Sequence, residues 1–258
     1  MLQNMEPIRM VNFFTIVKRF FVLKQGKILL NKLSPKFQVL NGPFKGMKYP
    51  HIDLGNSSLP ARIVGSYEMH LYPIIEKIIY THYIDMIDIG SSEGYFAVGL
   101  AMRMSQTMVH CFDINDEAMA FCKTMAQLNQ VQNMTFGTWC APETLIQFPF
   151  QGRGFIFCDC EGYELTLFTP EVVKALKNVD LLIELHDIFN PIISSEIKAQ
   201  FQQTHHIEII NNANNDYSTL QGLEPLSWFE KKIAIWEHRG GIGKNSIMEW
   251  VFLTAKLG

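Results

Sequence analysis

The segment MIDIGSSEGYFAV, residues 86–98, decides the fold because it holds the end of a strand, a tight turn and the start of a helix. Its apolar residues from Met86 to Ile89 are typical of a buried strand in a parallel sheet. Gly90 allows the backbone to turn sharply, and Gly94 removes the side chain where a ligand or the next helix comes close. The helix that follows points its free backbone N–H groups at whatever lies over the turn. The segment therefore predicts a ligand-binding turn of an α/β sheet.

The spacing of the glycines argues against a dinucleotide site. The fingerprint G-x-G-x-x-G needs glycine at the positions that Ser92 and Tyr95 occupy. What remains, Asp-x-Gly-x-x-x-Gly from Asp88 to Gly94, resembles motif I of class I S-adenosylmethionine (SAM) methyltransferases. The resemblance implies that the acidic strand residue and the glycine turn hold the methionine part of SAM. An ordinary strand-to-helix turn can also use two glycines, so the pattern alone leaves that alternative open.

Asp113 ends the next predicted strand, and it follows the glycine turn at about the 20-residue distance found in nucleotide folds. An acidic residue at this place accepts hydrogen bonds from ribose hydroxyls. Together with motif I, it makes SAM the expected cofactor. The residues that the resemblance places around SAM are Glu68, Asp88, Gly90, Ser91, Ser92, Glu93, Gly94, Tyr95, Phe96, Asp113, Ile114, Cys140, Ala141 and Asp159.

Strands and helices alternate along most of the chain. Hydrophobic periodicity predicts strands at 86–89, 109–113, 134–138, 155–160, 181–185, 206–210 and 248–255, helices at 71–82, 95–104, 117–128, 170–176 and 194–203, and a hairpin at 37–49. The expected fold class is α/β: a Rossmann-like, doubly wound, mostly parallel seven-stranded sheet with helices on both faces and a small N-terminal helix and hairpin extension. We expect this extension to cover residues 1–64 and the main domain to cover residues 65–258.

Charge is distributed unevenly over the 258 residues. The net charge of −3 argues against a nucleic-acid binder, yet residues 1–48 hold nine Lys or Arg against the single acid Glu6. A basic amphipathic helix near residues 10–30 is expected to pack on the sheet or on a second copy in a homodimer, with peripheral contact to an anionic membrane as the alternative. No secretory signal is convincing, so a cytoplasmic location is expected. The five cysteines lack the spacing of a zinc site and are interpreted as reduced thiols.

Acidic residues gather where two further predicted strands end. The run CDCEGYE at 158–164 places Asp159 and Glu161 on one face while the strand lasts, and LLIELHD at 181–187 does the same for Glu184 and His186. The pattern Asp-x-Glu-Gly-x-Glu at 159–164 with Ile-Glu-Leu-His at 183–186 resembles FkbM-type SAM-dependent methyltransferases over about residues 65–258. The chain departs from that pattern at Ser92, where a glycine is usual, and at Asp113-Ile114, where many relatives carry Glu-Pro.

The resemblance implies transfer of a methyl group to a hydroxyl of a sugar, glycan or related small metabolite. The hydroxyl needs a base, for which His186 is the first candidate and Asp159 the second. Glu161 and Glu184 are expected to orient the base or hold substrate hydroxyls. His186 can instead be a strand-end histidine satisfied by its acidic neighbours, and the carboxylates can instead bind Mg²⁺. An N-methyltransferase of a small amine or nucleobase, and a non-catalytic SAM-binding protein, are the alternative functions.

Overall fold

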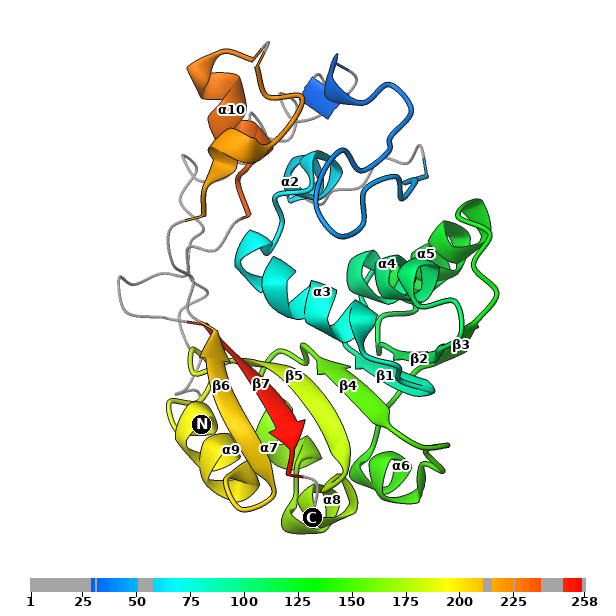
Figure 1. Ribbon diagram of the computed structural model, residues 1–258, viewed down its shortest axis with the longest axis vertical. Helices are drawn as coiled ribbons and strands as arrows, with labels where there is room; N and C mark the ends of the chain where they lie inside the picture. Colours follow the sequence, from blue (N-terminus) through cyan, green and yellow to red (C-terminus); the bar gives the residue numbers. More distant parts are fainter. Residues whose placement is uncertain are drawn as a thin grey trace, which may run out of the picture.

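A seven-stranded sheet forms the centre of the computed structural model, which describes residues 29–30, 32–50, 58–210, 215–224, 226–237 and 248–256. The strands are β1 (Asp85–Ile89), β2 (Met108–Phe112), β3 (Met134–Gly137), β4 (Gly154–Cys158), β5 (Val179–Leu185), β6 (His205–Ile210) and β7 (Glu249–Ala255). Their order in the sheet is β3-β2-β1-β4-β5-β7-β6, and only β7 runs antiparallel to its neighbours (Figure 1). The mostly parallel α/β fold predicted from the sequence is confirmed.

The chain leaves β1 toward β2 and β3 on one side and continues from β4 on the other, so the direction of winding reverses between β1 and β4. In open α/β sheets, ligands bind beyond the carboxyl ends of the strands at such a reversal. The residues that follow β1, β2 and β4 therefore meet at the place where a ligand is expected.

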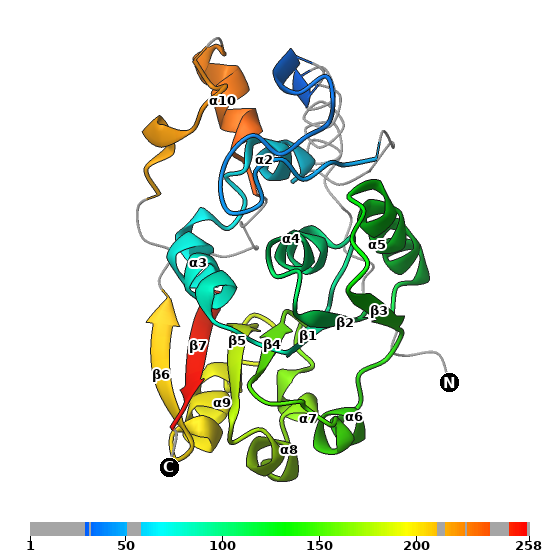
Figure 2. The same cartoon turned by 45° about the vertical axis from the view of Figure 1, so that its right-hand side comes forward.

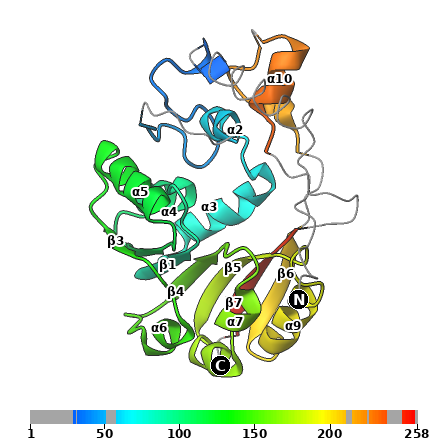
Figure 3. The ribbon, with the colours of Figure 1, turned by 180° about the vertical axis from the view of Figure 1, so that it is seen from behind.

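Helices cover both faces of the sheet. The helices α3 (Tyr72–Tyr80), α4 (Tyr95–Arg103) and α5 (Asp116–Leu128) lie on one face, and α6 (Pro142–Gln147), α7 (Glu164–Leu167), α8 (Pro170–Ala175) and α9 (Ile193–Phe201) lie on the other (Figures 1 and 3). The alternation of side chains along β1 divides the core accordingly, since Met86 packs in the cluster of the first face and Ile87 and Ile89 in that of the second. By this alternation Asp88 belongs to the first face.

A third apolar cluster joins α2 (Leu59–Val64) to α10 (Trp228–Ala234), which lie side by side beyond α3 in Figures 1 and 2. The short 3₁₀ helices are η1 (Met69–Leu71) and η2 (Tyr217–Thr219). The predicted hairpin is reduced to a single antiparallel bridge between Gln38 and Lys48. The predicted basic helix lies, up to residue 28, outside the described residues. Among the described residues, no helix combines the length and apolar character needed to cross a bilayer.

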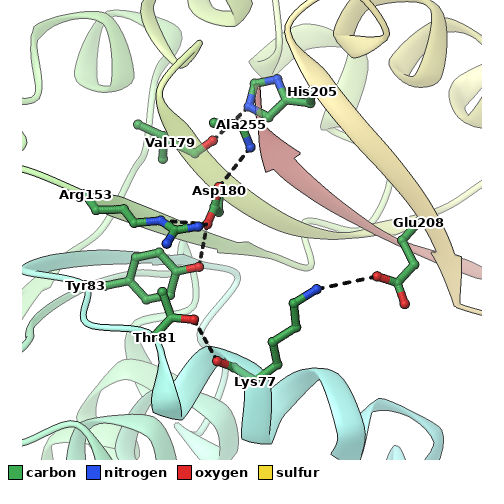
Figure 4. A network of polar contacts seen from close by, with 9 residues as sticks. All are labelled: Lys77, Thr81, Tyr83, Arg153, Val179, Asp180, His205, Glu208 and Ala255. Carbon is green, nitrogen blue, oxygen red and sulfur yellow. Dashed lines mark hydrogen bonds and ion pairs between the residues drawn. The ribbon is translucent and has the colours of Figure 1, made fainter. Parts of the chain in front are cut away.

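Asp180, on β5, anchors the sheet through a buried polar network (Figure 4). The Tyr83 hydroxyl donates to Asp180 Oδ2 at 2.6 Å, and Arg153 donates to the same oxygen through Nε at 3.1 Å and Nη2 at 2.7 Å. The backbone N–H of Ala255 donates to Oδ1 at 2.9 Å. Both oxygens of this carboxylate, which is only 1% exposed, are therefore satisfied by the protein itself.

Candidate functional site

A hollow of about 470 Å³ lies over the carboxyl ends of β1, β2, β3 and β4. We call it the larger hollow; its lining residues are Arg62, Tyr67, Ile89, Gly90, Ser92, Phe112, Asp113, Ile114, Thr138, Trp139, Cys140, Asp159, Cys160, Glu161 and Tyr163. The smaller hollow, of about 30 Å³, is lined by Arg62, Tyr67, Asp88, Gly90, Ser91, Ser92, Glu93, Tyr95, Phe96, Phe157 and Asp159. Since Arg62, Tyr67, Gly90, Ser92 and Asp159 line both, the two hollows are adjacent.

The turn after β1 requires glycine at two positions. Gly90 has φ +82°, and a Cβ there would lie 1.8 Å from the backbone oxygen of Asp159. Gly94 has φ +93°, and a Cβ there would lie 2.6 Å from Cys122 Sγ. A side chain at either position would push the turn away from β4 or α5. The two glycines that the sequence singled out thus allow the turn to lie close beneath the hollows.

Asp113 is fixed against this turn. Its Oδ2 accepts a hydrogen bond of 2.7 Å from the backbone N–H of Ser92, and its Oδ1 accepts one of 2.7 Å from that of Asn115. Ser92 has φ +48°, so this serine adopts the left-handed conformation that glycine adopts more easily. An ionised carboxylate offers about four lone-pair sites. Asp113 therefore keeps acceptor capacity toward the larger hollow, which it lines.

Asp88 is a buried carboxyl group at the end of β1. It is 1% exposed, and its Oδ2 has no hydrogen-bond partner among the described residues. Burial raises the pKa of Asp88 well above its ordinary value, and the charges of Asp159 and Asp113 raise it further. Because a buried unsatisfied carboxyl group is costly, its position on the wall of the smaller hollow points to a ligand group that satisfies it.

Strand β4 ends at Cys158, two residues earlier than the sequence predicted. The prediction that a common strand face aligns Asp159 with Glu161 is wrong, because Glu161 and Gly162 take left-handed conformations with φ +52° and +98°. Both acidic side chains nevertheless line the larger hollow. The turn, rather than the pleat of a strand, brings them there.

His186 follows β5 and contacts acids from the turn after β4, from α7 and from β5 itself. Its Nδ1 lies 2.5 Å from Glu164 Oε1, while its Nε2 lies 3.4 Å from Asp159 Oδ1, 3.6 Å from Glu161 Oε2 and 3.7 Å from Glu184 Oε2. Burial alone would lower the pKa of His186, but the hydrogen bond to Glu164 and the charges of Asp159, Glu164 and Glu161 outweigh burial and raise it. The imidazolium form is thereby favoured.

The same cluster offers ligand atoms to a cation. One atom each from Asp159, Glu184 and His186 lie within 4.8 Å of one another. Mg²⁺ binds oxygen ligands and keeps several of its waters, so a set that includes a buried imidazole does not fit this ion. We therefore derive no step of the chemistry through Mg²⁺.

Comparisons with known proteins give a limited match. No family model matches the chain. A stretch of 91 residues, 34% of this chain, is 33% identical to the release factor glutamine methyltransferase of Synechocystis sp. and covers 30% of that protein. The chain thus aligns with less than a third of the length of this curated relative.

Solved structures with a similar course of the chain include three methyltransferases. The precorrin-6y C5,15-methyltransferase of Geobacter metallireducens has a TM-score of 0.45 and 14% identity, and the match covers 72% of this chain and 87% of that one. An rRNA methylase of Streptococcus thermophilus has a TM-score of 0.47 and 13% identity over 72% of this chain and 95% of that one. A SAM-dependent O-methyltransferase of Thermotoga maritima has a TM-score of 0.47 and 11% identity over 74% of this chain and 66% of that one. Identities this low transfer no substrate to this chain.

Most residues expected around SAM line one of the two hollows, but three do not. Glu68 is buried with its Oε2 3.5 Å from His70 Nε2, Gly94 lies under the turn beside Cys122, and Ala141 precedes α6. His186 and Glu184 are also absent from both linings, which places them behind Asp159 and Glu161.

Several lining residues escaped the sequence prediction. The rings of Trp139 and Tyr163 lie 4.8 Å apart at the larger hollow. Trp139 directly precedes Cys140, which was singled out, and Tyr163 lies inside the quoted run at 158–164 without a role assigned to it. Arg62 and Tyr67 come from the chain before β1. For Arg62, on α2, no local signal in the sequence indicates burial beside a ligand site.

Proposed function

We propose that this protein is a SAM-dependent methyltransferase that modifies a hydroxyl of a sugar, a glycan or a related small metabolite. The observation that carries the proposal is the pair of hollows at the winding reversal, where the glycine turn, Asp88 and Asp113 surround one ligand space. The 91-residue match to a methyltransferase supports the reaction class independently.

The hollows fit the donor that the sequence implies. A volume of about 470 Å³ lies in the range of small-molecule sites. Asp113 retains acceptor sites for ribose hydroxyls, and the unsatisfied Oδ2 of Asp88 suits an ammonium group. The exposed ring of Trp139 and the half-buried ring of Tyr163 offer faces for a purine. When bound, SAM supplies an electrophilic methyl group on sulfur and a neutral thioether as leaving group.

Asp159 is the group best placed to receive the proton of the acceptor hydroxyl. It lines both hollows, whereas His186 is 1% exposed and lies behind it, with Nε2 3.4 Å from Asp159 Oδ1. A protonated His186, held on Glu164, orients the Asp159 carboxylate toward the acceptor. We therefore assign the proton transfer to Asp159 and a positioning role to His186. The alignment of acceptor and methyl group in a closed site supplies the rest of the catalysis.

We further propose an FkbM-type relationship for the segment from residue 65 onward. The residues that carry this resemblance, Asp159, Glu161, Glu164 and Glu184, all lie within 3.7 Å of the ring nitrogens of His186. The acids of the motif come from two different strand ends in the sequence, and in the structure they contact the same histidine. A small acceptor that presents hydroxyls to Glu161 and Asp159 fits this acidic wall better than a nucleic acid does. Homodimer formation and contact of the basic N-terminal segment with a membrane remain predictions.

Calorimetric titration with SAM and S-adenosylhomocysteine tests the donor assignment. Wild-type protein should bind both, and Asp113→Ala should lose affinity for both. Asp116→Ala is the matched control, because this exposed carboxylate begins α5 three residues away and lines neither hollow. Absence of binding to the wild-type protein contradicts the proposed function.

Transfer of a radiolabelled methyl group to a panel of sugars and glycans tests the acceptor class. Asp159→Asn should slow transfer by about 100-fold or more, and His186→Gln by less. Donor affinity should change little in His186→Gln, and transfer by Asp159→Asn is measured at saturating donor, because Asp159 also lines the smaller hollow. A rate loss that is greater for His186→Gln would return the role of base to the histidine.

Nitrogen acceptors are the second candidate class, since the matched relative is a glutamine methyltransferase. The same panel should therefore include small amines and glutamine-containing peptides. Labelling of these alone would replace the hydroxyl by a nitrogen as the target. Donor binding without transfer to any acceptor would favour a non-catalytic SAM-binding protein.

A further inference from the structure

Arg62 carries a charge into the site from outside the sheet. It lies in α2, 8% exposed, and lines both the larger and the smaller hollow. Buried arginines require partners, because an unpaired guanidinium in a poorly solvated place is costly. Because Arg62 is buried, each N–H group of its guanidinium is expected to have a hydrogen-bond acceptor.

The protein supplies partners for only some of the N–H donors of this guanidinium. Nη1 is ion-paired with Glu93, and the guanidinium donates a hydrogen bond to the Tyr67 hydroxyl. The guanidinium carbon lies 4.4 Å from the ring centroid of Tyr67 and 5.8 Å from that of Tyr95. Nε is buried and has no hydrogen-bond acceptor among the described residues. Arginine has five N–H donors in a planar fork, more than one carboxylate can accept. Arg62 thus keeps donors for a second anion.

The charged residues that line the smaller hollow indicate which charged groups a ligand in it would carry. Asp88, Glu93 and Asp159 are the acids of its lining, and Arg62 is the one permanent cation among the described residues that line it. A ligand that satisfies both kinds of group has an ammonium for the acids and a carboxylate for the arginine. With a volume of about 30 Å³, this hollow has room for a small head group rather than for an acceptor molecule.

We propose that Arg62 binds the α-carboxylate of the donor's amino-acid end, while Asp88 takes the ammonium group on the same carbon. The inference rests on the proposed function, because it concerns how SAM is recognised. It makes α2 part of the donor site, although the sequence assigned residues up to 64 to an extension. It also gives the site selectivity for donors that retain the carboxylate.

The test compares SAM with decarboxylated SAM, which lacks the carboxylate but keeps the sulfonium and the amine. By calorimetry, wild-type protein should prefer SAM by about 10- to 100-fold, the range expected for a charge-assisted hydrogen-bonded pair. Arg62→Met should abolish this preference: its affinity for SAM should fall by that factor, and its affinity for decarboxylated SAM should change by less than about 3-fold. Arg62→Lys, which keeps the charge over Tyr67, should restore part of the preference.

Arg103→Met is the matched control, because Arg103 on α4 pairs with Glu76 at 3.1 Å and lines neither hollow. It should bind the two ligands as the wild type does. If Arg62→Met weakens both ligands equally, the arginine only shapes the pocket and the inference fails. If Arg62→Met does not fold, the Arg62→Lys variant decides: an unchanged preference for SAM overturns the inference. Failure of wild-type protein to bind either ligand would instead contradict the proposed function.

Discussion

Asp88 and Asp180 are both buried in the central sheet, each 1% exposed, yet their surroundings differ completely. Asp180, near the beginning of β5, receives hydrogen bonds from Tyr83, Arg153 and the backbone of Ala255 (Figure 4). Asp88, near the end of β1, has an oxygen without a partner among the described residues. The protein itself supplies the hydrogen bonds of the Asp180 carboxylate, whereas an oxygen of Asp88 is available to a ligand. This difference separates a residue that holds the fold from one that binds.

The two positions also correspond to the two ends of a parallel sheet. Residues at the amino ends of the strands stabilise the fold, and residues at the carboxyl ends face the ligand. An unsatisfied polar group at the carboxyl end is therefore a cost in stability that a function explains. The following substitutions test this assignment.

Removal of the Asp180 carboxylate should have the largest effect. Asp180→Ala leaves the Tyr83 hydroxyl and the Arg153 guanidinium without their shared acceptor, so the free energy of unfolding should fall by about 3 kcal/mol. Urea unfolding followed by circular dichroism measures it. Donor affinity, extrapolated to fully folded protein, should stay at the wild-type value; a specific loss of binding would remove the contrast between the two aspartates.

Asp113 is an intermediate case, because backbone N–H groups occupy part of its acceptor capacity. Asp113→Ala should weaken donor binding by about 1 to 3 kcal/mol through the loss of charge-assisted hydrogen bonds. Its effect on stability should be smaller than that of Asp180→Ala, since Asp113 is only half-buried whereas Asp180 is buried. Calorimetric affinity and urea unfolding of the same preparation decide between these effects.

Asp88→Asn should produce the opposite sign in stability. The amide removes a buried ionisable group without changing its shape, so the free energy of unfolding at neutral pH should rise by about 1 kcal/mol. Donor affinity should fall, because an amide cannot ionise beside the ammonium group of the donor as a carboxyl group can. Thermal unfolding and calorimetry measure the two effects. A loss of stability would show that the protein itself uses the Asp88 carboxylate.

The gain from Asp88→Asn should depend on pH. Burial and the charges of Asp159 and Asp113 raise the pKa of Asp88 above the 3.8 of an ordinary aspartate, so the folded state holds a proton that the unfolded state releases. Stability therefore falls as pH rises from about 4 through the folded-state pKa. The difference between wild type and variant should vanish near pH 4 and grow toward neutrality, and a series of urea unfolding curves over this range checks the sign.

Much of the fold could be predicted from local sequence. Periodicity and glycine spacing located β1, the turn from Gly90 to Gly94 and the strand that Asp113 follows, because these depend on neighbours in the chain. The strand end at Cys158 was missed because the left-handed turn at Glu161 occurs at a residue that gives no sign of it. The sequence indicated the acids around His186 but not which of them are buried and which line the larger hollow. That difference depends on the packing of α7 and β5.

Arg62 shows a different limit. The sequence around Arg62 gives no sign of its burial, and only the tertiary fold shows that this residue of α2 lies beside the glycine turn. Arg62 and its partners Tyr67, Glu93 and Tyr95 are spread over residues 62–95. Contacts that depend on tertiary approach of this kind leave no periodic signal in the sequence.

Ser92→Gly should have the smallest effect and sharpens the comparison at the turn itself. Ser92 has φ +48°, a conformation that costs a non-glycine residue free energy, and glycine would remove this cost while adding conformational freedom to the unfolded chain. The two terms oppose each other, so stability should change by less than about 1 kcal/mol. The Ser92 N–H that donates to Asp113 remains in the variant, and donor affinity should therefore stay within about 3-fold of wild type. A larger loss of affinity would mean that the Ser92 hydroxyl, which donates to Glu93 Oε2 at 2.7 Å, is needed to hold Glu93 beside Arg62.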